Sequence, residues 1–228
     1  MELGEIEKRQ DRTAGSARIT SLAWAGVAGT VCFAASVVLM HIIQPDLSPF
    51  NEAVSYYMNG RFGWVLGLGL VSLGAGSLCL YWAIRRAGAV GARLGSWCLA
   101  LWGAGAAIGG IFPPDPRGHW GEPPSVAGMI HANVAMIAFL LFPIAAVLLS
   151  KEVGQLSRSS NLQVLLRVLA LSSSLMLLIF FASLVPIFVH RAPFLLGLTE
   201  RLLLAAYLAW LATAAMSVLG AATVKTER

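Results

Sequence analysis

Six long apolar segments, separated by shorter polar ones, dominate the pattern of the chain. They cover residues 20–43, 62–84, 94–112, 125–149, 162–189 and 199–222. A helix needs roughly 20 apolar residues to cross the about 30 Å of hydrocarbon in a bilayer, because each residue adds about 1.5 Å. The pattern therefore predicts an all-α, polytopic integral membrane protein with six transmembrane helices over residues 20–222. Tails are expected at residues 1–19, where the chain should fray, and at residues 223–228. The sixth helix has a second possible start, because Pro193 can open a helix before residue 199.

The polar stretch at residues 44–60, between the first two apolar segments, has a helical pattern of its own. Ser48 can cap a helix, and Pro49 suits its first turn. Apolar side chains then recur at helical spacing, at Phe50, Ala53, Val54, Tyr57 and Met58. We expect a short helix in the membrane interface, in the first outer loop. The simplest interpretation is an amphipathic lid with one solvated edge.

Small residues recur at helical spacing in the second and third apolar segments. They are Gly63, Gly67 and Gly74 in the second, and Gly103, Ala107 and Gly110 in the third. In lipid such residues allow two helix backbones to approach closely. The pattern predicts that each of these two helices packs closely against another helix of the bundle.

The composition excludes a soluble globular domain. Hydrophobic residues make up 57% of the chain and charged residues 12%, with a mean hydropathy of +0.75, whereas about 25% of a typical soluble domain is charged. The net charge of +5 does not indicate nucleic-acid binding, because the basic residues flank the apolar segments. Cys32, Cys79 and Cys98 all lie inside apolar segments, so they indicate no disulfide framework.

Basic residues are distributed unequally between the two sides of the predicted membrane. With six spans, twelve lysines and arginines fall on the side of both termini, and only Arg61, Arg117, Arg191 and Arg201 fall on the other. Cytoplasmic loops carry the excess of basic residues in membrane proteins. The sequence therefore predicts a multi-pass protein of the bacterial cell membrane with both termini in the cytoplasm.

Ionisable residues gather at the predicted outer side. All four histidines, His41, His119, His131 and His190, fall at or near it. The first hypothesis is a polar pocket at the outer mouth of the bundle that binds a membrane lipid headgroup or a small polar ligand. Its predicted lining consists of Glu52, Ser55, Tyr57, Asp115, His131, Glu200 and Arg201. Arg201 would pair with a phosphate group or with Asp115.

His131 lies about two turns inside the fourth predicted span. Ionisable groups at that depth are costly and normally have a partner in the bundle. Asp115 and His119 are the nearest candidates by topology. The alternative is a neutral histidine that is hydrogen-bonded to a backbone carbonyl.

A metal site is the second hypothesis, from a different functional class. Asp115, His119 and His131 could bind zinc as three ligands with one open position, as in a metal-dependent membrane hydrolase with Glu52 as general base. A haem between His41 and His131 is a weaker alternative. The third hypothesis is a structural or accessory subunit, with no cofactor, whose polar residues satisfy one another.

Several short motifs, taken in order, resemble the DUF998 family of bacterial six-span membrane proteins. The first are His41-x-x-x-Pro45-Asp46-Leu47, Ser55-x-Tyr57 and Gly60-x-x-Gly63. Phe112-Pro113-x-Asp115, Gly128-x-x-His131 and Gly197-x-x-Glu200-Arg201, with Trp210, follow. The resemblance covers about residues 23–219. It implies the six-span fold and the polar positions, but no activity, since the function of this family is unknown.

Overall fold

The computed structural model describes residues 2–89, 91–118, 122–157, 159–190 and 193–226. Six long helices and one short 3₁₀ helix make up its secondary structure, with no strand in these ranges. The long helices are α1 (Glu2–Ile43), α2 (Gly63–Ala87), α3 (Arg93–Ile111), α4 (Val126–Leu156), α5 (Ser160–His190) and α6 (Leu196–Thr226). Each is long and apolar enough to cross a membrane, which confirms the predicted fold class.

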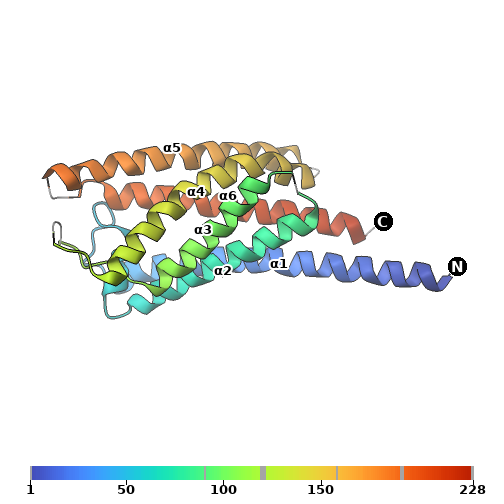
Figure 1. Ribbon diagram of the computed structural model, residues 1–228, viewed down its shortest axis with the longest axis horizontal. Helices are drawn as coiled ribbons and strands as arrows, with labels where there is room; N and C mark the ends of the chain where they lie inside the picture. Colours follow the sequence, from blue (N-terminus) through green and yellow to red (C-terminus); the bar gives the residue numbers. More distant parts are fainter. Residues whose placement is uncertain (1, 90, 119–121, 158, 191–192, 227–228) are drawn as a thin grey trace.

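The helices form a closed bundle in which each one contacts the next along the chain, and α6 returns to contact α1 (Figure 1). α6 also contacts α2 and α4, so it is the most central helix. Both termini lie at one end of the bundle, which we call the termini side; we call the opposite end the lid side. α1 begins at Glu2, so the segment that was expected to fray continues the first helix.

The small residues of α2 and α3 form a close contact between these two helices. A Cβ atom added at Gly74 would lie 2.5 Å from the carbonyl oxygen of Gly103 and 2.6 Å from the backbone nitrogen of Ala107. A Cβ at Gly110 would lie 2.5 Å from the carbonyl oxygen of Gly67. Real side chains do not approach backbone atoms this closely, so the two helices touch only because these positions lack side chains.

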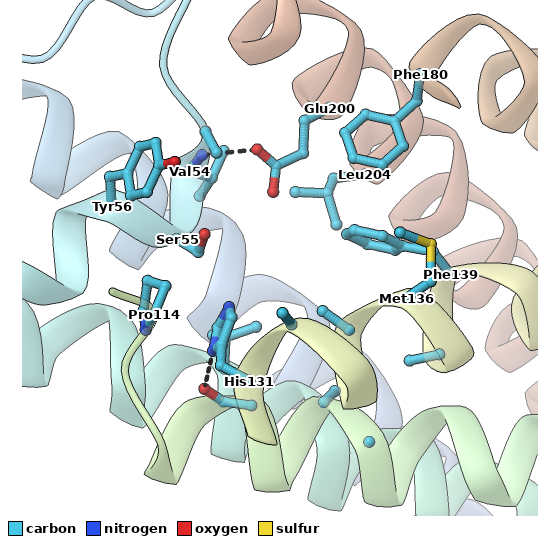
Figure 2. Close-up of a pocket in the computed structure, with 18 of the residues that line it drawn as sticks. Val54, Ser55, Tyr56, Pro114, His131, Met136, Phe139, Phe180, Glu200 and Leu204 are labelled. Carbon is cyan, nitrogen blue, oxygen red and sulfur yellow. Dashed lines mark hydrogen bonds between the residues drawn. The ribbon is translucent and has the colours of Figure 1, made fainter. Parts of the chain in front are cut away.

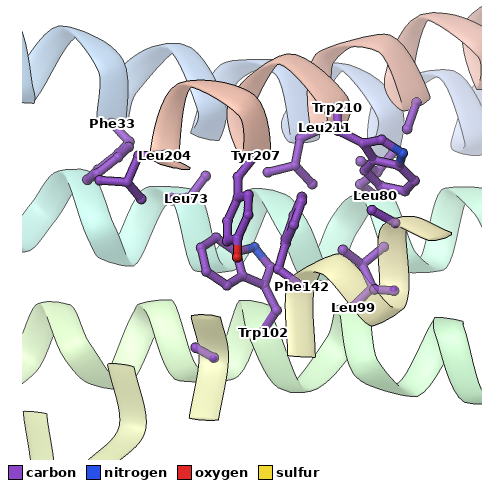
Figure 3. Close-up of a cluster of buried hydrophobic side chains, with 14 of the residues drawn as sticks. Phe33, Leu73, Leu80, Leu99, Trp102, Phe142, Leu204, Tyr207, Trp210 and Leu211 are labelled. Atoms are coloured by element: carbon purple, nitrogen blue, oxygen red, sulfur yellow. The ribbon is translucent and has the colours of Figure 1, made fainter. Parts of the chain in front are cut away.

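An aromatic core fills the middle of the bundle (Figure 3). The rings of Phe142 and Tyr207 stack with centroids 4.0 Å apart, and Trp102 meets both edge-on. The Tyr207 hydroxyl donates to the carbonyl of Phe139 at 2.8 Å, and the Trp210 indole donates to Ser150 Oγ at 3.0 Å. The polar atoms of these rings are therefore satisfied inside an apolar environment.

The segment between α1 and α2, residues 44–62, covers the lid side of the bundle, and we call it the lid. Its helix is a 3₁₀ helix, η1 (Val54–Asn59), which begins five residues after Pro49, where the sequence predicts the first turn. Residues 49–52 form a turn in which Phe50 is exposed, whereas Val54 and Tyr57 are buried. The predicted apolar stripe is thus divided between a turn and η1.

The lid is held to the start of α6 by hydrogen bonds. The backbone N–H of Leu198 donates to the carbonyl of Phe50 at 3.0 Å, and that of Leu195 donates to Asn51 Oδ1 at 3.1 Å. The lid backbone also lies directly against Gly197, where a Cβ would collide with the carbonyls of Pro49 and Glu52. These contacts fix the lid on α6 and position the cavity below it.

Candidate ligand cavity

A cavity of about 260 Å³ lies beneath the lid, between η1 and helices α1 to α6 (Figure 2). Its walls are mainly apolar and come from Phe33, Leu66, Leu73, Trp102, Met136, Phe139, Phe180, Leu184, Ile187 and Leu204, among others. Its few polar side chains are Ser55, Tyr56, His131 and Glu200. The cavity therefore combines an apolar interior with a small polar region next to the lid.

Glu200 is the acidic residue of this cavity. It lies in the second turn of α6, and only 6% of its surface is exposed. Its Oε2 accepts a 2.7 Å hydrogen bond from the backbone N–H of Val54 in the lid. Its Oε1 has no hydrogen-bond partner among the described residues and points into the cavity (Figure 2). α6 begins at Leu196, between the two predicted starts at Pro193 and Thr199, so Glu200 lies inside the helix and needs such a partner.

His131 faces the same cavity from α4. Its Nδ1 lies 2.8 Å from the carbonyl oxygen of Phe112 and 3.1 Å from that of Gly109, at the end of α3. A ring nitrogen between two acceptors must carry the proton, so neutral His131 has its lone pair on Nε2. Nε2 is directed into the cavity (Figure 2). The geometry matches the simpler interpretation of His131, a histidine bonded to carbonyls, and still leaves one nitrogen free to accept.

Ser55 and Tyr56 add hydroxyl groups from η1. The Ser55 hydroxyl makes no hydrogen bond within the described part of the chain, and it faces the cavity (Figure 2). Burial raises the pKa of the Tyr56 phenol above its ordinary value, and the negative charges of Glu200 and Glu52 raise it further. Tyr56 therefore stays protonated at physiological pH.

Arg201, which was expected in the pocket, lies in a neighbouring cluster instead. Its Nε donates to His41 Nε2 at 3.0 Å, and its Nη1 donates to the carbonyls of Glu52 and Gly197, each at 2.9 Å. The guanidinium also lies 5.9 Å from the centre of the Tyr57 ring. Nε and Nη1 thus bond α1, the lid and α6, whereas the buried Nη2 has no hydrogen-bond partner in the described part of the chain. The predicted ion pair between Arg201 and Asp115 is not formed among the described residues.

His41 has a fixed protonation pattern in this cluster. Its Nδ1 lies 2.6 Å from the carbonyl oxygen of Val37, so Nδ1 carries a proton, and Nε2 accepts from Arg201. The lone pair of Nε2 is thus engaged, which argues against His41 as a haem ligand.

Glu52 and Asp115 stabilise loops rather than line the cavity. Glu52 accepts from the backbone N–H of Ser48 at 2.7 Å and from Arg117 Nη1 at 2.6 Å. Asp115 accepts from the backbone N–H of Ser125, the N-cap residue of α4, at 3.2 Å. A Cβ at Gly128 would collide with the Asp115 carboxylate. The sequence places both residues near the lid side, but their partners come from distant segments and depend on the fold.

Two of the three predicted metal ligands, Asp115 and His131, lie within the described residues. Asp115 caps the start of α4, and His119 lies outside the described residues. Within the described ranges, no three His, Cys, Asp or Glu side chains come together as a metal would require.

The structure thus brings three of the seven predicted pocket residues, Ser55, His131 and Glu200, into one cavity. Two further groups of this site, Tyr56 and the backbone N–H of Val54, were not predicted. The sequence does not show which of the neighbouring residues Tyr56 and Tyr57 faces the cavity, because that depends on the helical geometry of η1. A backbone N–H is present at nearly every residue, so its role cannot be identified from the sequence.

A family model described as "Protein of unknown function (DUF998)" matches residues 27–217 of the chain. No curated protein and no solved structure matches the chain.

Proposed function

The chain belongs to the DUF998 family, whose function is unknown, and we propose from the geometry of the cavity that it binds an amphipathic, lipid-like molecule. The apolar part of this molecule would lie between α3 and α6, and its polar end would meet Ser55, His131 and Glu200. One observation carries the proposal: the buried Glu200 carboxylate holds the lid with one oxygen and directs the other into a largely apolar cavity.

An ionisable side chain inside a membrane protein is costly and usually marks a functional site. If the bundle needed only packing at this position, an apolar residue in α6 would be more stable. Glu200 and His131 both direct an unpaired acceptor into the same cavity, from opposite walls (Figure 2). This arrangement favours a ligand over a purely structural role.

The polar atoms of the cavity also select the chemistry of the ligand. Glu200 Oε1 and His131 Nε2 are acceptors, so the polar end of the ligand must donate hydrogen bonds. An alcohol or an amine meets this requirement, whereas a phosphate or a carboxylate would meet the Glu200 carboxylate with no lysine or arginine in the cavity lining. Arg201, the expected partner of a phosphate, does not line the cavity. The proposal thus narrows the expected lipid headgroup or polar ligand to an uncharged or cationic one.

The size of the cavity limits the ligand. Pockets for small molecules commonly have volumes of about 300–1,000 Å³, and this cavity, at about 260 Å³, is slightly smaller. It suits one short alkyl chain better than a complete phospholipid. The excess of basic residues on the termini side supports an orientation in the cell membrane with the lid side outward.

The test compares ligands that differ only at the polar end. Native mass spectrometry of the detergent-purified protein would measure binding of decylamine, decanol and decanoate. We expect one bound decylamine or decanol per chain and at least about tenfold weaker binding of decanoate, equivalent to about 1.4 kcal/mol. Glu200→Gln should reduce this selectivity, whereas Asp46→Asn, at an exposed carboxylate of the lid, should retain it. Equal binding of all three ligands to the unmodified protein would contradict the proposal.

A further inference from the structure

Another cavity, of about 240 Å³, lies on the termini side, between the end of α2 and the beginning of α3. Its lining residues are Tyr81, Arg85, Arg93, Ser96 and Trp97. None of them lines the cavity beneath the lid, so the two sites are separate. The termini-side cavity has the opposite charge, since two arginines line it and no carboxylate does.

Ser96 contributes a buried hydroxyl with no partner. Only 3% of the residue is exposed, and its Oγ makes no hydrogen bond within the described part of the chain. Buried polar groups in native proteins are nearly always paired, so each exception needs an explanation. A bound acceptor, such as an oxygen of an anion, would satisfy this hydroxyl.

The beginning of α3 concentrates positive charge at the cavity. Ala92 precedes the helix and offers no side chain to cap its free N–H groups. The N-terminus of a helix carries a partial positive charge and favours anions. Arg93, the first residue of α3, adds a full positive charge there, which is unfavourable unless an anion is nearby. Glu152 of α4 places a carboxylate against Gly91 in the adjacent turn and supplies one negative charge there, with its Oε2 buried and unpaired in the described part of the chain. Glu152 does not line the cavity, whose lining holds two arginines and no carboxylate.

Aromatic residues place this cavity at the level of the membrane interface. Trp97 and Trp82 have exposed fractions of 62% and 52%, and the rings of Tyr81 and Trp97 lie 6.3 Å apart. Tryptophan and tyrosine are enriched where the hydrocarbon of a bilayer meets water, which is the depth of the lipid phosphates.

We propose that the termini-side cavity binds the phosphate group of an anionic phospholipid from the adjacent leaflet. Arg85 and Arg93 would bind the phosphate oxygens from two helices, Ser96 would donate a hydrogen bond, and Trp97 would pack against the glycerol region. Basic pockets between transmembrane helices are suited to such headgroups. The bound lipid would connect α2 to α3 at their shared turn.

Native mass spectrometry with added lipid would test this site. After delipidation, the protein should bind one molecule of added phosphatidylglycerol in preference to added phosphatidylcholine. Arg85→Gln and Arg93→Gln should each weaken this binding by about fivefold, which corresponds to the usual contribution of one basic residue near an anionic lipid surface. Arg86→Gln is the matched control, because Arg86 lies over the Trp82 ring and does not line the cavity. Equal weakening by Arg86→Gln would overturn the proposal in favour of general surface attraction.

Ser96→Ala separates a binding role from a structural one. The substitution removes an unpaired buried hydroxyl, so the lipid-free protein should unfold at the same or a higher temperature, while retention of phosphatidylglycerol falls. Unchanged retention in Ser96→Ala would contradict the role of its hydroxyl. Glycerol phosphate distinguishes the source of the anion: equal affinity for glycerol phosphate and phosphatidylglycerol would overturn the assignment to a lipid.

Discussion

The backbone N–H of Val54 donates a 2.7 Å hydrogen bond to Oε2 of Glu200, although the two residues lie 146 positions apart in the chain. The bond joins the lid to the second turn of α6. Because the same carboxylate directs its other oxygen into the cavity, one side chain serves both the closure of the lid and the polar end of the proposed site (Figure 2). Substitutions at this position can therefore separate the two roles.

Glu200→Ala should destabilise the protein more than Glu200→Gln. Alanine leaves the buried N–H of Val54 without an acceptor, which costs about 1–3 kcal/mol. Glutamine retains a carbonyl oxygen at the same place and should preserve the lid while it alters ligand selectivity. Thermal unfolding in detergent, followed by tryptophan fluorescence, measures the difference. Equal unfolding temperatures for the two variants would mean that the bond to Val54 does not stabilise the lid.

Arg201→Ala should loosen the lid without removing any wall of the cavity. The substitution removes the hydrogen-bond donor to His41 Nε2 and to the carbonyls of Glu52 and Gly197. We expect the free energy of unfolding to fall by about 3 kcal/mol. Arg201→Lys keeps the charge but not the planar set of donors, so it should restore only part of this loss. Hydrogen exchange in residues 44–62 should increase in both variants. The control is Arg61→Ala, since Arg61 lies over the Phe62 ring on the same side; an equal effect there would contradict the role of Arg201.

High pH should destabilise the protein partly through Tyr56. Burial and the charges of Glu200 and Glu52 raise the pKa of this phenol above its ordinary value of about 10. The folded state thus holds the proton more tightly than the unfolded state. This contribution is fully present below about pH 10 and is lost as the pH rises further. Tyr56→Phe should therefore lose less stability between pH 9 and 11 than the unmodified protein, as thermal unfolding at the two values would show. Identical losses would indicate that Tyr56 is not buried as described.

The fold could be predicted from the sequence because its signals are local and strong. Each of the six apolar segments predicts a transmembrane helix by its length alone. The spacing of the glycines in α2 and α3 predicts that these helices approach a neighbouring backbone closely. The lid was harder to predict. An α-helical stripe from Phe50 to Met58 was expected, but the hydrogen bonds between residues 50–52 and α6 hold the first part as a turn.

The candidate site was predicted only in part, because its residues come from distant segments. Depth in the membrane marked His131 as a residue that needs a partner, and marked Glu200 as one only if the sixth helix began early. It could not show that those partners are backbone groups, the carbonyls of Gly109 and Phe112 and the N–H of Val54. Arg201 and Asp115 looked complementary in charge, yet each is bonded to a different element.

Glycine at position 74 should be required for the contact between α2 and α3. A Cβ at this position would lie 2.5 Å from the Gly103 carbonyl and 2.6 Å from the Ala107 nitrogen, and backbone atoms of two packed helices cannot move aside independently. Gly74→Ala should therefore cost about 1–3 kcal/mol, the usual cost of overpacking. Gly15→Ala is the matched control, because nothing lies within 4 Å of a Cβ there. At that position alanine should stabilise α1 by about 0.5–1 kcal/mol, since it restricts the unfolded chain more than glycine does. Thermal unfolding in the same detergent should give a lower unfolding temperature for Gly74→Ala and a higher one for Gly15→Ala than for the unmodified protein. An unchanged unfolding temperature in Gly74→Ala would mean that α2 and α3 are further apart than described.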